Sequence, residues 1–74
     1  MIKVVCIDNI RELINGIKIY DTDIKIGEIY DALGNGLYYK IIFNGENIGI
    51  KEKRFFITLA EWREQQINSI LDEL

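Results

Sequence analysis

Residues 25–51 read KIGEIYDALGNGLYYKIIFNGENIGIK, and the rest of the chain extends or covers what this stretch builds. Asn44-Gly45 and Gly34-Asn35-Gly36 divide it into three runs that are rich in Ile, Tyr and Phe. An Asn-Gly pair suits a two-residue type I′ turn because both of its positions need a positive φ, and the other glycine turn is one residue longer. The stretch predicts a three-stranded antiparallel meander, with strands at Glu28–Leu33, Leu37–Phe43 and Glu46–Lys51.

The N-terminal segment contains one clear strand and one ambiguous region. Ile2–Ile7 is a run rich in β-branched residues that Asp8-Asn9 brings to an end, which predicts a first strand. Ile10–Asp23 contains a further Asn-Gly pair, Asn15-Gly16, so it is either a small hairpin or a long loop over the mouth of a barrel. In this region and just after it, alternation places four isoleucines inward, at Ile17, Ile19, Ile24 and Ile26.

The C-terminal segment reads as a turn followed by a helix. Glu52–Phe56 resembles a short helical turn that tucks one or both phenylalanines under the sheet. Thr58 and Glu61 form a capping box, in which each side chain satisfies a backbone N–H at the start of a helix. Beyond them, apolar residues recur at helical spacing and form one stripe, at Leu59, Trp62, Ile67, Ile70, Leu71 and Leu74.

These elements predict a single small domain of the α+β class that is mostly β. Their order resembles the plan of an SH3-like barrel, so we expect an antiparallel barrel at residues 1–57 and an amphipathic helix at residues 58–74. An isolated helix of ~16 residues is marginal in water, so its apolar stripe needs a surface to lie on. That surface is the sheet, a second copy of the chain, or a foreign partner.

Composition narrows the classes of partner. The 74 residues are 49% hydrophobic and contain no proline, which argues against disorder and for one domain with its own core. The formal net charge is −3, and residues 59–74 alone account for it. Neither part of the chain offers the basic surface that phosphate binding requires, so nucleic acid is disfavoured as a partner.

The single cysteine and the hydropathy pattern indicate a cellular location. Cys6 has no second cysteine with which to form an internal disulfide, and we expect it in the core. Met1–Ile7 reads as a strand and not as a secretory signal. No run approaches the ~20 apolar residues of a membrane span. We therefore expect a cytoplasmic protein that does not associate with membranes.

The residues offer no basis for catalysis. The chain has no histidine, which excludes His-based acid–base chemistry and His-ligated metals. Asp21 and Asp23 could sit together, but a solvated acidic loop is the better interpretation. No glycine turn has the spacing of a phosphate-binding loop. We expect no enzymatic activity, no cofactor and no metal.

Three binding functions remain, and we favour the last. A groove for proline-rich peptides needs a tryptophan beside the meander, and the only tryptophan lies in the helix. A base-stacking platform of Tyr38, Tyr39 and Phe43 is better interpreted as core and rim packing. The helical stripe is more apolar surface than a thin barrel needs, and tryptophan is enriched in interface hot spots. We therefore predict binding to a protein partner, with a homo-oligomer through the helix as a further expectation, using Leu59, Trp62, Ile67, Ile70, Leu71, Tyr38 and Arg54.

Four motifs extend over about two-thirds of the chain: Lys3-Val4-Val5-Cys6-Ile7-Asp8-Asn9, Gly27-Glu28-Ile29-Tyr30, Tyr39-Lys40-Ile41 and Arg54-Phe55. In these motifs the chain resembles small phage and prophage proteins of Gram-positive hosts. Members of that group generally have no assigned activity, so the resemblance implies no catalytic or binding residue. It implies a small SH3-like fold and an origin in a phage or mobile element within a bacterial host. The absence of catalytic groups beside a surplus apolar helix adds the expectation of an accessory role, as an adaptor or an inhibitor of a host protein.

Overall fold

The computed structural model describes residues 1–72, with side chains for 1–34 and 36–68. The described chain is mostly β and ends in a helix, as predicted. Its elements in order are β1 (Ile2–Cys6), β2 (Ile10–Ile14), β3 (Ile17–Tyr20), β4 (Ile29–Asn35), β5 (Tyr38–Phe43), β6 (Glu46–Glu52), the 3₁₀ turn η1 (Lys53–Phe55), β7 (Phe56–Thr58) and α1 (Leu59–Asp72).

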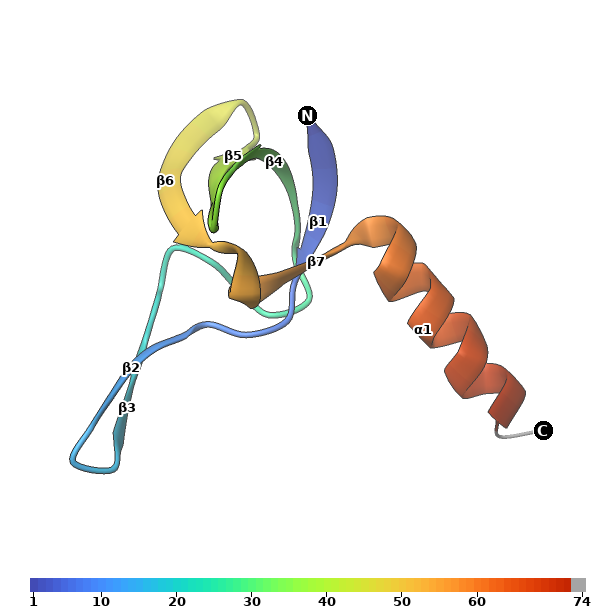
Figure 1. The fold of residues 1–74 in the computed structure, drawn as a ribbon, viewed down its shortest axis with the longest axis horizontal. Helices are drawn as coiled ribbons and strands as arrows, with labels where there is room; N and C mark the ends of the chain where they lie inside the picture. Colours follow the sequence, from blue (N-terminus) through green and yellow to red (C-terminus); the bar gives the residue numbers. More distant parts are fainter. Residues whose placement is uncertain (73–74) are drawn as a thin grey trace.

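Five strands form one antiparallel sheet in the order β6-β5-β4-β1-β7, and the predicted meander is its β4-β5-β6 part. The sheet curls strongly on itself (Figure 1). Strands β6 and β7 are its two edges and do not pair with each other, so hydrogen bonds do not close the barrel. The chain crosses from one edge to the other through η1.

Two tight turns hold the meander. Asn44 and Gly45 have φ values of 53° and 80°, the positive angles that the Asn-Gly pair predicts. At the other turn Asn35 pairs with Tyr38, so only Gly36 and Leu37 form the loop and Gly34 belongs to β4. This turn is one residue shorter than expected, because a single positive φ, 60° at Gly36, is enough to reverse the chain.

The core lies inside the curl. It contains one side of the strands and the two phenylalanines that η1 tucks under the sheet, as predicted: Val4, Cys6, Ile24, Tyr30, Ala32, Ile41, Phe55 and Phe56. Aromatic rings meet edge to face at its centre, with the centroids of Tyr30 and Phe56 6.2 Å apart. The outer face of β5 is not covered, since Tyr38 is 48% exposed and α1 packs against β1 and β7.

The ambiguous segment is a hairpin that projects from the barrel (Figure 1). Strands β2 and β3 pair only with each other, around a turn in which Asn15 and Gly16 have φ values of 51° and 80°. We call residues 10–20 the hairpin arm. The predicted inward placement is correct for Ile24, which is buried, and wrong for Ile17 and Ile26, which are mostly exposed. Alternation separates the two faces of a strand, but the arm has no second layer to face.

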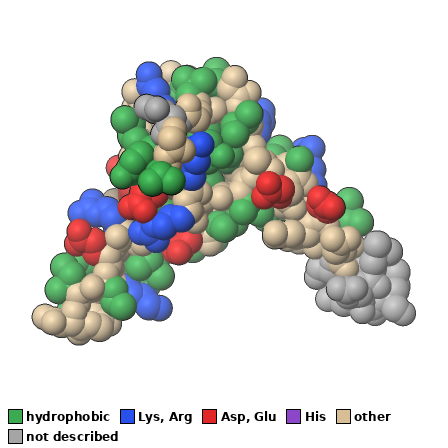
Figure 2. All heavy atoms as spheres, viewed as in Figure 1, with side chains coloured by type: hydrophobic (Ala, Val, Ile, Leu, Met, Phe, Trp, Pro, Cys, Tyr) green, Lys and Arg blue, Asp and Glu red, His purple; other side chains and the backbone are tan. Residues whose placement is uncertain are grey.

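Helix α1 leaves the sheet at β7. The Thr58 hydroxyl accepts a hydrogen bond from the Glu61 N–H at 3.2 Å, which is the first half of the predicted capping box. The helix packs against β1 and β7. Its later turns extend away from the barrel, on the same side as the hairpin arm, so the molecule has the outline of an inverted V in Figure 2.

Candidate binding site

A partly buried ion cluster fixes the base of the hairpin arm to the barrel. Lys51 of β6 reaches two carboxylates of the segment that leaves the arm, with Nζ 2.9 Å from Oδ2 of Asp21 and 2.9 Å from Oδ2 of Asp23. The Asp21 side chain is 7% exposed and that of Lys51 12%. The expectation of a solvated acidic loop is therefore wrong for Asp21, because Lys51 supplies a counter-ion inside the barrel mouth.

The charges of this cluster stabilise one another. Burial by itself raises the pKa of Asp21, but hydrogen bonds from Lys51 and from the Asp23 N–H, with the charges of Lys51 and Arg11, outweigh it and lower that pKa. Burial by itself lowers the pKa of Lys51, and the hydrogen bonds to Asp21 and Asp23 outweigh it and raise that pKa.

Backbone groups complete the attachment. The Asp21 N–H donates to the Asn9 carbonyl at 2.7 Å, and the Ile10 N–H donates to the Asp8 carboxylate at 3.0 Å. On the side of the core, the Lys25 N–H donates to the Tyr30 hydroxyl at 3.0 Å. The direction of the arm is thus set by hydrogen bonds at its base, while its tip is free of the barrel.

A shallow pocket opens beside this base, between the start of β5 and the end of β6. Its volume is about 270 Å³, and we call it the Tyr38 pocket. Five residues line it: Leu37, Tyr38, Glu52, Lys53 and Arg54. Leu37 is 80% exposed and Tyr38 beside it is 48% exposed, so two adjacent apolar side chains face solvent here.

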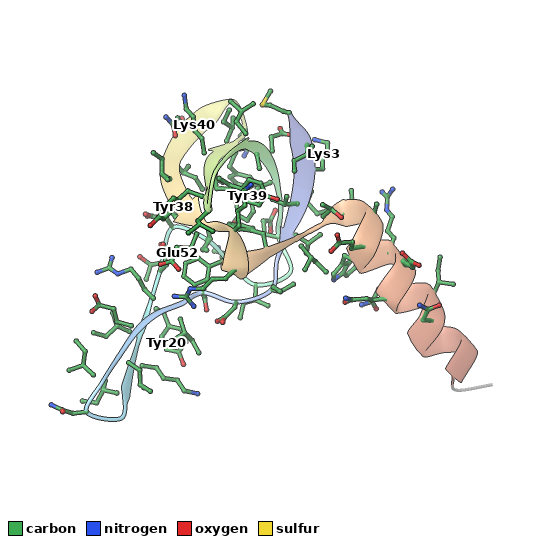
Figure 3. All side chains as sticks on the ribbon, viewed as in Figure 1. Lys3, Tyr20, Tyr38, Tyr39, Lys40 and Glu52 are labelled. Atoms are coloured by element: carbon green, nitrogen blue, oxygen red, sulfur yellow. The ribbon has the colours of Figure 1, made fainter. Side chains whose placement is uncertain are left out.

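The local sequence explains why these residues meet. Tyr38 and Glu52 are directly paired across β5 and β6, and Figure 3 shows them side by side at the edge of the curled sheet. The Lys53 N–H then donates to the Leu37 carbonyl at 2.9 Å, which joins η1 to the Gly36-Leu37 turn. The turn at Leu37 and the end of β6, which are more than ten positions apart in the chain, thereby form one wall of the Tyr38 pocket.

Two cations border the pocket, each held on an aromatic ring. The Nζ of Lys53 lies 4.9 Å from the centroid of the Tyr39 ring, and the guanidinium of Arg54 lies 4.3 Å from that of Phe55. Arg54 also pairs with Glu52 and donates to the Ile10 carbonyl at 3.4 Å. The side chains of Arg54 and Glu52 remain about half exposed. Because these two charges cancel, Lys53 gives the lining of the pocket its net charge of +1.

The predicted binding residues separate into two groups. Tyr38 and Arg54 come together in the Tyr38 pocket, whereas the helical residues lie on the other side of the barrel. Leu59 and Trp62 are half-buried, Ile67 is 58% exposed, and Ile70 and Leu71 lie outside the residues whose side chains are described. Leu37 and Lys53 also line the pocket but are not among the predicted residues. The sequence signal for Leu37 is a leucine directly after a glycine turn, whereas no sequence pattern places Lys53 beside it.

A second hollow lies where α1 leaves the sheet. Its volume is about 420 Å³, and Ile2, Lys3, Thr58, Leu59, Ala60 and Arg63 line it. It is wide and shallow, and Lys3 already pairs with Asp31 at 2.7 Å. We regard it as the join between helix and sheet.

The base-stacking platform is not formed. Tyr38 lies on the outer face of β5, whereas Tyr39 and Phe43 point inward against other rings, with the centroid of Phe43 5.1 Å from that of Tyr30. Among the described residues, no three His, Cys, Asp or Glu side chains are grouped so that they could hold a metal ion. No helix within residues 1–72 has the length and apolar character to span a bilayer.

Comparison of the chain with known protein families, with curated proteins and with solved structures finds no match.

Proposed function

We propose that this protein is a non-enzymatic accessory protein that binds another protein through the Tyr38 pocket. The observation that carries the proposal is the pair of exposed apolar side chains, Leu37 and Tyr38, held beside the cations of Lys53 and Arg54. Exposed apolar surface rimmed by polar groups is typical of interaction sites, and Tyr and Arg are enriched in hot spots.

The size of the pocket supports a peptide over a small molecule. At about 270 Å³ and open to solvent, it lies below the ~300–1,000 Å³ of sites that enclose a small ligand. It has room for one apolar side chain of a partner. The positive charge at its rim favours an acidic residue next to that side chain, because Arg and Lys form their strongest hydrogen bonds with carboxylates.

The biological setting belongs to the same proposal. The resemblance to phage and prophage proteins supports an accessory protein of a phage or mobile element, acting in the bacterial cytoplasm as an adaptor or inhibitor of a host protein. Its support is the sequence pattern of β1 and of the meander.

The test is capture of partners from bacterial lysate by the tagged chain, with nuclease and without it, read by mass spectrometry. Tyr38→Ala and Arg54→Glu should abolish capture of a discrete protein that the unmodified chain retains under both conditions. Lys40→Glu is the matched control. Lys40 is an exposed cation of β5, the strand that also carries Tyr38, but it does not line the pocket. Its replacement by Glu changes the net charge by the same amount as Arg54→Glu.

The sequence of the captured protein then identifies the residues that the Tyr38 pocket recognises. Overlapping peptides of its sequence should bind best where an apolar residue is followed by Asp or Glu, and should lose binding when that acid is replaced by Lys. Equal loss of capture in all three variants would contradict the Tyr38 pocket as the site. Recovery that disappears with nuclease, and weakens steeply with salt, would replace the proposal with nucleic-acid binding.

A further inference from the structure

The two projecting elements carry apolar side chains that the barrel does not cover. On the hairpin arm Leu13 is 66% exposed, Ile14 49%, Ile17 68% and Tyr20 52%. A two-stranded hairpin alone is marginally stable in water and needs a further strand or a packed face. On α1, Ile67 is 58% exposed in a part of the helix that extends beyond the sheet (Figure 1). Both elements therefore expose apolar side chains of the kind that an interface usually buries.

The amount of uncovered surface matches the needs of an interface. A chain of 8.7 kDa exposes ~4,700 Å² when it is compact, and this chain exposes 5531 Å². Its radius of gyration is 13.8 Å, where ~11 Å is expected for 74 residues. The excess, roughly 800 Å², is about what each partner buries in a standard protein–protein interface.

The charges of the two elements are opposite. The hairpin arm carries Arg11 and Lys18 against Glu12, a net charge of +1. Residues 59–74 carry four carboxylates against one cation, Arg63, a net charge of −3, and Figure 2 shows acidic side chains on the visible face of the helix. Two helices facing each other would repel, whereas an arm facing a helix would attract.

We propose that the chain forms a two-fold symmetric dimer in which the hairpin arm of each copy packs against helix α1 of the other. The arm and the helix project to the same side of the barrel and diverge (Figure 1). A two-fold axis along the viewing direction of Figure 1, set between the ends of the V, brings each arm beside the partner's helix. The interface is isologous, so it closes with two copies and covers one face of each element.

One face of each element suits this contact. Leu13 and Lys18 are paired across the arm, and Tyr20 shares their face by alternation. Glu64 lies three residues before Ile67, so the two share a face of α1. Apolar contact of Leu13 with Ile67 of the partner subunit therefore places Lys18 within reach of the partner's Glu64. The Tyr38 pocket is not part of this interface, so the dimer does not depend on the proposed function.

The test is the molecular mass of the full chain by sedimentation equilibrium, from low micromolar to millimolar concentration. The unmodified chain should approach the mass of a dimer as concentration rises. Leu13→Asp and Ile67→Asp each place a carboxylate in both contacts of the dimer and should raise the dissociation constant by more than ~10-fold. Both positions are exposed, so thermal melts of dilute protein should stay near those of the unmodified chain.

Mixing and charge exchange identify the pairing. A mixture of Leu13→Asp and Ile67→Asp chains forms one undamaged contact, between the intact arm of one chain and the intact helix of the other, and should associate more strongly than either variant alone. Lys18→Glu and Glu64→Lys should each weaken the dimer, and one chain with both changes should recover it. A chain that stays monomeric throughout, a dimer that neither Asp variant weakens, or a mixture no stronger than its components would each overturn the proposal.

Discussion

The Nζ of Lys51 lies 2.9 Å from Oδ2 of Asp21, and both side chains are almost entirely enclosed although 30 residues separate them in the chain. The contact joins the edge strand β6 to the segment that leaves the hairpin arm. An ion pair in this position costs desolvation free energy, which its Coulombic attraction and its extra hydrogen bonds must offset. We interpret the Lys51–Asp21 ion pair as the contact that fixes the direction of the hairpin arm relative to the barrel.

Removal of the lysine should be strongly destabilising. Lys51→Met leaves the Asp21 carboxylate buried without a counter-ion, and we expect a loss of ~3–5 kcal/mol in the free energy of unfolding measured in urea. The double change with Asp21→Asn should cost less than the sum of the single changes by at least ~1 kcal/mol. Lys3→Met is the control, because the exposed Lys3–Asp31 pair should contribute no more than ~1 kcal/mol. Additive effects of the Lys51 and Asp21 changes would show that the two residues are not coupled.

The pH dependence of stability should reveal the same pair. The fold lowers the pKa of Asp21 from its ordinary value of 3.8, so the ionised form stabilises the native state above that pH. This contribution should disappear as the pH falls below 3.8 and through the native pKa. The fold raises the pKa of Lys51 above 10.5, so its contribution is complete below pH 10.5 and is lost as the pH rises further.

Thermal melts across this range are the measurement. In the Asp21→Asn variant, the decline of the melting temperature below pH 3.8 should be shallower than in the unmodified chain. An acid limb that is unchanged by Asp21→Asn would show that other carboxylates cause it.

The curl of the sheet separates two isoleucines that have the same propensities. Ile41 on β5 is 0% exposed at the centre of the core, and Ile50 on the neighbouring strand β6 is 67% exposed. Ile41→Ala should lower the free energy of unfolding by ~2–5 kcal/mol, because it leaves a cavity in the core. Ile50→Ala should change stability by no more than ~0.5 kcal/mol. Equal costs at the two positions in urea titrations would contradict the inward side of β5.

The thiol of Cys6 should be unreactive in the native protein. Its side chain is 1% exposed, and burial raises its pKa above the ordinary value. An alkylating reagent at mildly alkaline pH should therefore label it slowly, at a rate set by unfolding, and rapidly in denaturant. Immediate labelling without denaturant would show that the end of β1 opens easily.

Local features could be predicted from the sequence because they depend on residues that are close in the chain. The Asn44-Gly45 pair favours positive φ angles by itself, and the Thr58 hydroxyl caps the N–H of Glu61 only three residues away. The two phenylalanines that follow β6 pack into the single core of this small domain. The class of the fold and the meander followed from these signals.

Features that depend on distant residues needed the folded chain. Alternation marked Ile17 and Ile24 alike, yet one is exposed on the arm and the other is buried, because only the second segment returns to the barrel. The Tyr38 pocket exists because the Lys53 N–H reaches the Leu37 carbonyl. The arm and the helix point to the same side because β7 and the Lys51 cluster hold their bases, and strand periodicity carries no information about such directions.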